Sequence, residues 1–258
     1  MRLRFAGMMR RGWLYLLVIF VQFIPPYASK PHGWEETPKV IAITLSNALV
    51  FSCPQIYPLF KVLPIVLIAL VIAFRSRVSR IFDAYVGITY VLFAVLQGVA
   101  ITDEYGLTVI TGNLLMMLIV STVWFWDVFA QKNDFMPVSR PLWRYWVVPP
   151  AFLAFWFPLN PETLMPDFNP VYLFTNVAGL TFCMMTPVYI SILTLYYPKC
   201  NTTTLSVTSL AGTIIGFYNV MWNFIIFPEK LWWNGVLHIP LLTISIYGLA
   251  LPITRPKK

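Results

Sequence analysis

Long apolar segments alternate with short polar loops along almost the whole chain. The apolar segments lie at about 13–27, 40–53, 57–74, 82–101, 107–129, 143–158, 171–197, 205–227 and 231–253. A hydrocarbon core about 30 Å thick is crossed by roughly 20 apolar residues in a helix. Because most of these segments are close to that length, the pattern predicts an all-α, polytopic bundle of transmembrane helices.

The segment 40–53 is an exception to this pattern. It has only about 14 residues and is bounded by Pro38 and Pro54. If it crossed the bilayer, the basic stretch 75–80 would lie outside, whereas Lys and Arg favour cytoplasmic loops. We therefore expect a short re-entrant or interfacial helix on the outer face at about 40–53, and about eight spans from the other segments.

The loops differ in charge in an alternating order. With eight spans, the segments on one side carry 14 Lys and Arg and 3 acids, and those on the other side carry 4 Lys and Arg and 7 acids. The positive-inside rule then predicts a multi-pass integral membrane protein with cytoplasmic N- and C-termini. If the first segment were instead a cleaved signal peptide, seven spans would remain, but the sequence 25–29 (PPYAS) is a poor cleavage site.

Composition agrees with a membrane protein. Of 258 residues, 59% are apolar and 11% are charged, compared with about 25% charged in soluble proteins. We expect one integral membrane domain, 1–258. The net charge of +8 comes from residues at the ends of spans, so the expected partners are the lipid bilayer and, as a second class, other membrane subunits, and not nucleic acid.

Amides and one histidine are the main polar groups within the predicted spans, and all of them fall in the outer half. Amides in a bilayer can join helices through hydrogen bonds of about 0.6 kcal/mol each. Polar residues in spans can also line a binding site. The second interpretation predicts an outward-facing cavity, lined by amides and aromatics, for a polar or amphipathic small ligand. Its candidate residues are Gln97, Asn113, Asn176, Asn219, Trp222, Asn223 and His238.

Two carboxylates occupy the cytoplasmic ends of predicted spans. Asp83 and Asp127 lie close in sequence to basic loops, so we expect ion pairs with Arg80, Arg140 or Arg144. We identify no lysine within a span, which argues against a retinal-binding opsin. The Gly212-Thr-Ile-Ile-Gly216 pattern favours close helix packing within the chain over dimerisation.

Reaction motifs such as HExxH, GxSxG and the P-loop are absent from the sequence. His32 with Glu35 and Glu36 matches no metal-ligand spacing. We expect no metal site and assign no catalytic residue and no cofactor. The first functional hypothesis is a transporter, channel or receptor-like protein. The alternatives are a non-catalytic accessory or structural subunit of a larger membrane complex, and a membrane-embedded enzyme that uses His238 on a lipid-like substrate. The missing motifs favour a non-enzymatic role.

Overall fold

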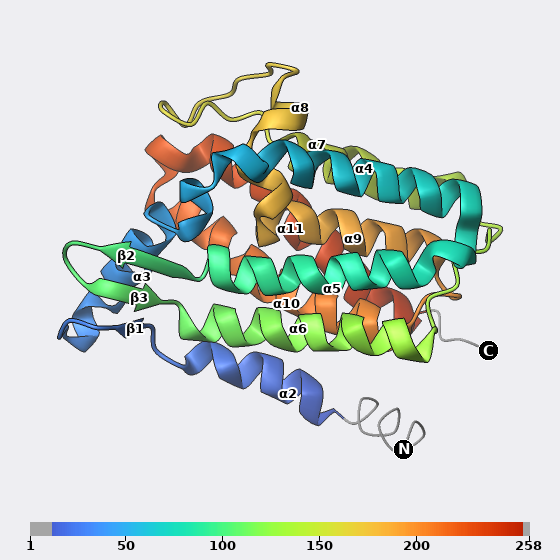
Figure 1. The fold of residues 1–258 in the computed structure, drawn as a ribbon, viewed down its shortest axis with the longest axis horizontal. Helices are drawn as coiled ribbons and strands as arrows, with labels where there is room; N and C mark the ends of the chain where they lie inside the picture. Colours follow the sequence, from blue (N-terminus) through green and yellow to red (C-terminus); the bar gives the residue numbers. More distant parts are fainter. Residues whose placement is uncertain (1–11, 255–258) are drawn as a thin grey trace.

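The computed structural model describes residues 12–254, of which most are helical (Figure 1). Helices account for 74% of the structure and strands for 5%, which confirms an all-helical architecture. The basic stretches 1–11 and 255–258, on which the predicted side of the termini partly depends, lie outside the described residues.

The described elements, in chain order, are α2 (Trp13–Phe20), η1 (Val21–Phe23), β1 (Tyr27–Ala28), η2 (Trp34–Glu36), α3 (Thr37–Ser46), η3 (Leu49–Ser52), η4 (Pro54–Ile56), α4 (Tyr57–Phe74), η5 (Arg75–Val78), α5 (Ser79–Leu96), β2 (Val99–Thr102), β3 (Gly106–Val109), α6 (Thr111–Ala130), η6 (Leu142–Val147), α7 (Val148–Trp156), α8 (Tyr172–Thr175), η7 (Val177–Leu180), α9 (Phe182–Tyr196), α10 (Thr202–Met221), η8 (Trp222–Ile226) and α11 (Pro228–Thr254).

The main helices run side by side along the long axis of the molecule, and the chain reverses direction at the two ends (Figure 1). The turn η5, the segment between α6 and α7, and the turn before α10 lie at one end, on the right in Figure 1. We call it the basic end, after Arg75, Arg77, Lys132 and Lys199. The strands and α3 lie at the opposite end, which we call the acidic end, after Asp103 and Glu104.

Four helical stretches in the described chain are long and apolar enough to cross a membrane. A fifth would be a pair of helices bent by 94°, Tyr172–Leu180 and Phe182–Tyr196. The first of the four stretches folds back on itself at η5, so that α4 and α5 are separate helices of 18 residues each (Figure 1). The structure therefore supports an integral membrane protein, and eight crossings remain a prediction.

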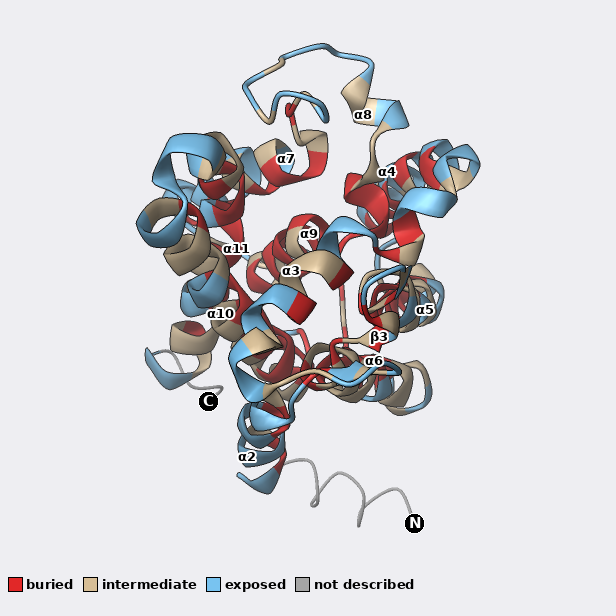
Figure 2. Ribbon diagram, turned by 90° about the vertical axis from the view of Figure 1, so that its left-hand side faces the viewer, coloured by how far each residue is buried: buried red, intermediate tan, exposed pale blue. Residues whose placement is uncertain are grey.

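Helix α9 forms the centre of the bundle. All but three of its 15 residues are buried, and Figure 2 shows it enclosed by the other helices, whose outward faces are exposed. A helix that is apolar and buried on every side needs partners all around it. The exposed faces carry large apolar side chains, such as Ile65, Val66 and Ile72 of α4, which suits contact with lipid.

Aromatic side chains from three helices pack in the core. The ring of Trp124 lies 6.1 Å from that of Phe82 and 6.4 Å from that of Tyr189, each edge to face. The indole Nε1 of Trp124 donates to Oγ1 of Thr208 at 3.0 Å, and the hydroxyls of Tyr90 and Thr186 are 2.9 Å apart. Because such polar atoms need partners when buried, these bonds fix the orientation of the rings.

Helices α10 and α11 approach closely through glycines. A Cβ atom at Gly212 would lie 2.2 Å from Oγ of Ser245, and one at Gly216 would lie 2.9 Å from Cα of Leu242. Both glycines of the GxxxG pattern therefore face α11 of the same chain. The expectation of internal packing is confirmed.

A small three-stranded antiparallel sheet, in the order β1-β3-β2, was not predicted. The hairpin pairs Val99–Thr102 with Gly106–Val109 around a three-residue loop, and Gly106 supplies the positive φ of 68° that such a loop requires. In the segment predicted as an outer-face helix at 40–53, the helix α3 ends at Ser46. The rest of that segment turns and reaches the sheet edge through a bridge between Ala48 and Ala100.

Candidate functional site

The apolar segment 171–197, which by length predicts one span, is broken in the structure. Tyr172–Leu180 and Phe182–Tyr196 meet at 94°. The preceding helix α7 also stops early, at Trp156, where Phe157 adopts a left-handed conformation with φ of 53°. Such interruptions leave backbone donors and acceptors that the helices themselves cannot satisfy, which is costly in an apolar environment.

Side chains from other segments bond to the end of α7. Nδ2 of Asn176 donates to the carbonyl oxygens of Trp156 at 2.8 Å and Phe157 at 3.0 Å, and Oδ1 of the same amide accepts from the backbone N–H of Ala178 at 3.1 Å. Nζ of Lys61 donates to the carbonyl of Phe155. The carboxyl end of a helix carries a partial negative charge, so Lys61 lies where a cation is favoured.

The amino end of α9 is bonded by Gln97, the residue that follows α5. Its Oε1 accepts from the backbone N–H of Phe182 at 2.6 Å. The chain just before this point is tightly held, because a Cβ atom at Gly179 would lie 2.4 Å from the carbonyl oxygen of Phe60. The broken segment is therefore fixed against both α4 and α5.

Lys61 corrects the prediction that the spans contain no lysine. It is the fifth residue of α4, it is fully buried, and its Nζ lies 4.2 Å from the ring centroid of Phe155. The argument against an opsin therefore loses its basis. Within the described residues the only ion pair joins Lys39 and Glu104, so Lys61 has no carboxylate partner there. Its position inside the apolar stretch 57–74 was the signal in the sequence.

Three other predicted residues, Asn219, Asn223 and His238, form a chain of hydrogen bonds with Asn234, which was not predicted. The chain joins the end of α10 and η8 to α11. Nδ2 of Asn223 donates to the carbonyl of Asn219 at 2.7 Å, and Nδ2 of Asn234 donates to Oδ1 of Asn223 at 2.9 Å. Nδ1 of His238 lies 2.7 Å from the carbonyl oxygen of Asn234. A carbonyl oxygen can only accept, so Nδ1 carries the hydrogen, and Nε2 of the neutral ring is an acceptor.

The side chains that cap α7 and α9 and the hydrogen-bond chain beside α11 come together at the start of α9, but within the described residues their hydrogen bonds do not join into a single ring. Gln97 bonds to Phe182, and Nδ2 of Asn219 lies 3.7 Å from Sγ of the next residue, Cys183. Asn113 lies in the first turn of α6, and its side chain forms none of the hydrogen bonds found between residues 12 and 254. Trp222 opens the π-helix η8, and its ring lies 5.1 Å from that of Phe227. A ligand-binding role for these residues remains a prediction.

A separate polar cluster lies near the basic end of the molecule. Nδ2 of Asn133 donates to Oδ1 of Asp83 at 2.9 Å and to Oδ2 of Asp127 at 3.0 Å. Asp127 also accepts from Nδ2 of Asn201 at 2.9 Å and from the hydroxyl of Thr204. The carboxylates of Asp83 and Asp127 are 1% and 0% exposed. We call these five residues the carboxylate–amide cluster.

The expected pairing of Asp83 and Asp127 with arginines is wrong. Arg144 instead donates to the carbonyl of Tyr197 at 3.2 Å, and Arg140 donates to the carbonyl of Leu195. Amide side chains from two loops, Asn133 and Asn201, bond to the carboxylate oxygens instead. The sequence carries a signal for Asn201, since an asparagine before a run of threonines is typical of a helix N-cap. In the structure its Oδ1 accepts from the N–H of Thr203, as an N-cap does.

No protein family, no curated protein and no solved structure matches this chain.

Proposed function

We propose that the chain crosses the bilayer eight times with both termini in the cytoplasm. The crossings would be α2, α4, α5, α6, α7, α9, α10 and α11. The connections between consecutive members of this set lie at alternate ends of the ribbon (Figure 1). The basic end would face the cytoplasm, as the positive-inside rule favours.

The short crossings in this arrangement have a physical explanation. Trp13–Phe23 and α7 are each shorter than the roughly 20 residues that a straight span needs. Asn176 and Lys61 bond to the free carbonyls at the end of α7. Trp13–Phe23 is fixed to α6, because Nε2 of Gln22 donates to the carbonyl of Gly112 at 3.1 Å. Irregular backbone at membrane depth is tolerated where protein groups satisfy it.

Reporter fusions test this topology. Reporters that follow Lys258 and that are inserted within 160–170 should lie on opposite sides of the membrane. A third reporter placed within 75–80 should lie on the same side as the one at Lys258. Fusions at Lys258 and within 160–170 on the same side would contradict the proposal.

We further propose that the interrupted segment around the start of α9 is part of the binding site of a transporter, channel or receptor-like protein. The observation that carries this proposal is a helix broken by 94° inside the bundle, next to the early end of α7. Gln97 bonds to the backbone at the break, and Asn176 and Lys61 bond to the end of α7. Discontinuous helices of this kind form the substrate sites of many secondary transporters.

The proposed site favours a polar or amphipathic ligand that presents a hydrogen-bond acceptor. The amino end of α9 carries a partial positive charge, and Gln97 now supplies the acceptor for the N–H of Phe182. A ligand oxygen could replace the amide oxygen of Gln97 at that position. The ligand would enter from the acidic end, where the amides lie closest to the surface.

Uptake into proteoliposomes tests the transport form of the proposal. A panel of labelled amino acids, sugars and nucleosides would be screened with the purified wild-type protein. We expect saturable uptake of at least one compound, and a loss of about tenfold or more in Lys61→Met. Lys61→Met replaces a buried charge with an apolar side chain of similar volume but removes the donor to the carbonyl of Phe155. Its unfolding free energy would therefore be measured beside uptake, and should fall by no more than about 1–2 kcal/mol.

His238→Gln is the matched control, because it retains hydrogen bonding and removes only the titrating group. Uptake should survive in this variant with a modest loss. If the protein instead turns over a lipid-like substrate and His238→Gln lowers the rate about 10²-fold, general acid–base catalysis is the better assignment. If uptake by Lys61→Met equals that of wild type, Lys61 has no role in transport and only caps the end of α7.

A further inference from the structure

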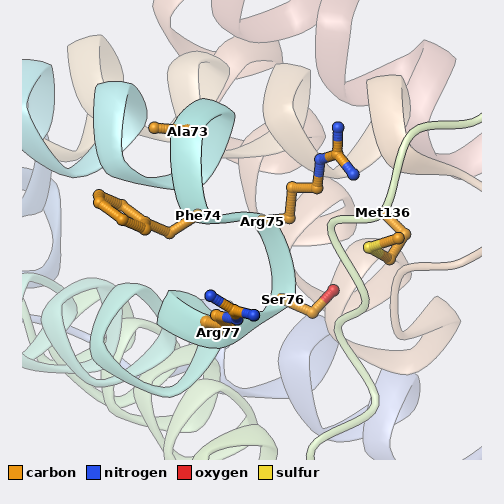
Figure 3. A pocket seen from close by; sticks show the side chains of 6 residues that line it. All are labelled: Ala73, Phe74, Arg75, Ser76, Arg77 and Met136. Carbon is orange, nitrogen blue, oxygen red and sulfur yellow. The ribbon is translucent and has the colours of Figure 1, made fainter.

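A hollow of about 360 Å³ opens at the basic end, where α4 turns into η5. It is lined by Ala73, Phe74, Arg75, Ser76, Arg77 and Met136 (Figure 3). Five of these residues are consecutive, and Met136 reaches the hollow from the segment between α6 and α7. We call it the Arg75 hollow.

The backbone of Arg75 adopts an unfavourable conformation. Its φ of 55° and ψ of −132° are close to those of the second residue of a type II′ turn, a position that glycine usually occupies. A side chain in this region strains the backbone, and such strain persists where the surroundings impose it, often at binding sites. The turn itself would form more readily with glycine, so the turn does not explain the arginine.

Hydrogen bonds hold the far side of the hollow in place. The hydroxyl of Ser76 donates to Oδ1 of Asp134, and the same oxygen accepts from the backbone N–H of Met136 at 3.0 Å. Asp134 thus ties the α6–α7 segment to the turn. Although this carboxylate is nearby, it forms no ion pair with either arginine of the hollow, since Lys39–Glu104 is the only pair between residues 12 and 254.

The arginines at this site carry positive charge that no carboxylate of the described chain neutralises through an ion pair. Arg75 and Arg77 are both exposed. Arg140 lies at the same end, with its Cζ 5.4 Å from the ring centroid of Tyr196, and Tyr196 is also within electrostatic range of Arg75. The hollow is therefore lined by guanidinium groups and by the apolar side chains of Ala73, Phe74 and Met136, with Phe74 and Met136 on opposite sides of the turn (Figure 3).

We propose that the Arg75 hollow binds the phosphate of an anionic phospholipid. The guanidinium groups of Arg75 and Arg77 donate to the phosphate oxygens, and Phe74 and Met136 contact the start of an acyl chain. Arginine binds phosphate through charge-assisted hydrogen bonds, and basic residues directly beside a membrane helix attract anionic lipids. The proposal rests on the proposed crossing of α4, which places the end of this helix among headgroups, and is independent of transport.

Native mass spectrometry of the delipidated protein tests the site with three probes: phosphatidylglycerol, phosphatidylcholine with the same acyl chains, and inorganic phosphate. We expect wild type to bind phosphatidylglycerol about tenfold more tightly than phosphatidylcholine, and not to bind inorganic phosphate at matching concentrations. Arg75→Gln and Arg77→Gln should each reduce this preference about fivefold or more. Arg80→Gln is the control, because it removes the same charge from the same end without lining the hollow.

Arg75→Gly distinguishes the contribution of the guanidinium to lipid binding from the effect of the strained backbone on stability. Because glycine fits the φ of Arg75, this variant should unfold at a higher temperature than Arg75→Gln while losing lipid preference to the same degree. Equal binding of the two lipids by wild type, or equal losses in Arg75→Gln and Arg80→Gln, would overturn the proposal. Tight binding of inorganic phosphate would reassign the hollow to a soluble anion. Reporter fusions that contradict the topology would instead remove the premise that α4 crosses.

Discussion

The polar groups within the bundle are organised differently at its two ends. Near the basic end, the carboxylate–amide cluster joins three segments around Asp127, and its acceptors and donors bond to one another. Towards the acidic end, Gln97, Asn176 and Lys61 bond to backbone atoms at the interruptions of α7 and α9. The first arrangement connects side chains to side chains, whereas the second completes broken helices.

This difference suggests that the carboxylate–amide cluster is a rigid structural element, and that the interrupted helices α7 and α9 are the part of the bundle that can move. A buried network in which every member is satisfied rigidifies its surroundings, and the loss of one member leaves several groups unpaired. A cap on an interrupted helix satisfies a few backbone atoms, and the segment can rearrange if another partner replaces it. We therefore expect global consequences from changes at the basic end and local consequences from changes at the acidic end.

The largest effect should follow from Asp127→Ala. This change removes the acceptor of hydrogen bonds from Asn133, Asn201 and Thr204, all of them buried. Each buried donor left without a partner costs about 1–3 kcal/mol, so the protein should lose about 3 kcal/mol or more of its unfolding free energy. Denaturant unfolding in detergent, followed by tryptophan fluorescence, measures the loss.

Asp83→Ala is the matched control for this measurement. Asp83 shares only the amide of Asn133 with the cluster, so its loss should be clearly smaller than that of Asp127. Equal effects of the two substitutions would show that burial of a carboxylate, and not its position in the network, determines stability. That result would remove the contrast between the two ends.

A smaller and more local effect should follow from Asn176→Ala. The change deletes two donors to the end of α7 and one acceptor for Ala178, at a cost of about 1–2 kcal/mol for a lost cap. Amide hydrogen exchange should accelerate within 155–182 and remain unchanged in α5 and α10. Asn113→Ala deletes the same side chain where it forms no hydrogen bond within the described chain, and should leave exchange unaltered. A uniform increase over all helices would contradict a local role.

The sequence predicts the apolar helices but neither of these polar arrangements in full. Composition and loop charge suffice for an all-helical membrane protein. The strands were hidden because Val99, Ile101, Leu107 and Val109 are apolar at every other position and extended the neighbouring helical segments. The break before Phe182 depends on Gln97, which lies 85 residues away, so no local pattern reveals it. The amides Asn133 and Asn201 meet Asp127 only after two loops fold together.

The smallest effect concerns the ion pair that joins α3 to the hairpin at the acidic end. The hydrogen bond between Lys39 and Glu104 lowers the pKa of Glu104 from 4.5 and raises the pKa of Lys39 from 10.5. Because the pKa of Glu104 is lowered on folding, its contribution to stability is present above pH 4.5 and is lost as the pH falls through the folded value. Because the pKa of Lys39 is raised, its contribution is present below pH 10.5 and is lost as the pH rises through the folded value.

Both side chains are about half exposed, at 55% and 46%, so solvent and salt screen the pair and its contribution should be barely measurable. Thermal midpoints of wild type and Glu104→Gln, compared at low salt, should therefore differ slightly between about pH 4.5 and 10.5, and the difference should shrink as the pH falls through the lowered pKa of Glu104. Added salt should remove the difference at neutral pH. A difference that does not shrink as the solution is acidified below pH 4.5 would show that the charge of Glu104 is not its cause. A large difference in thermal midpoint at neutral pH would mean that the contact between α3 and the hairpin stabilises the protein far more than two exposed charges can explain. Changes at the acidic end would then also have global consequences, which contradicts the contrast with the basic end.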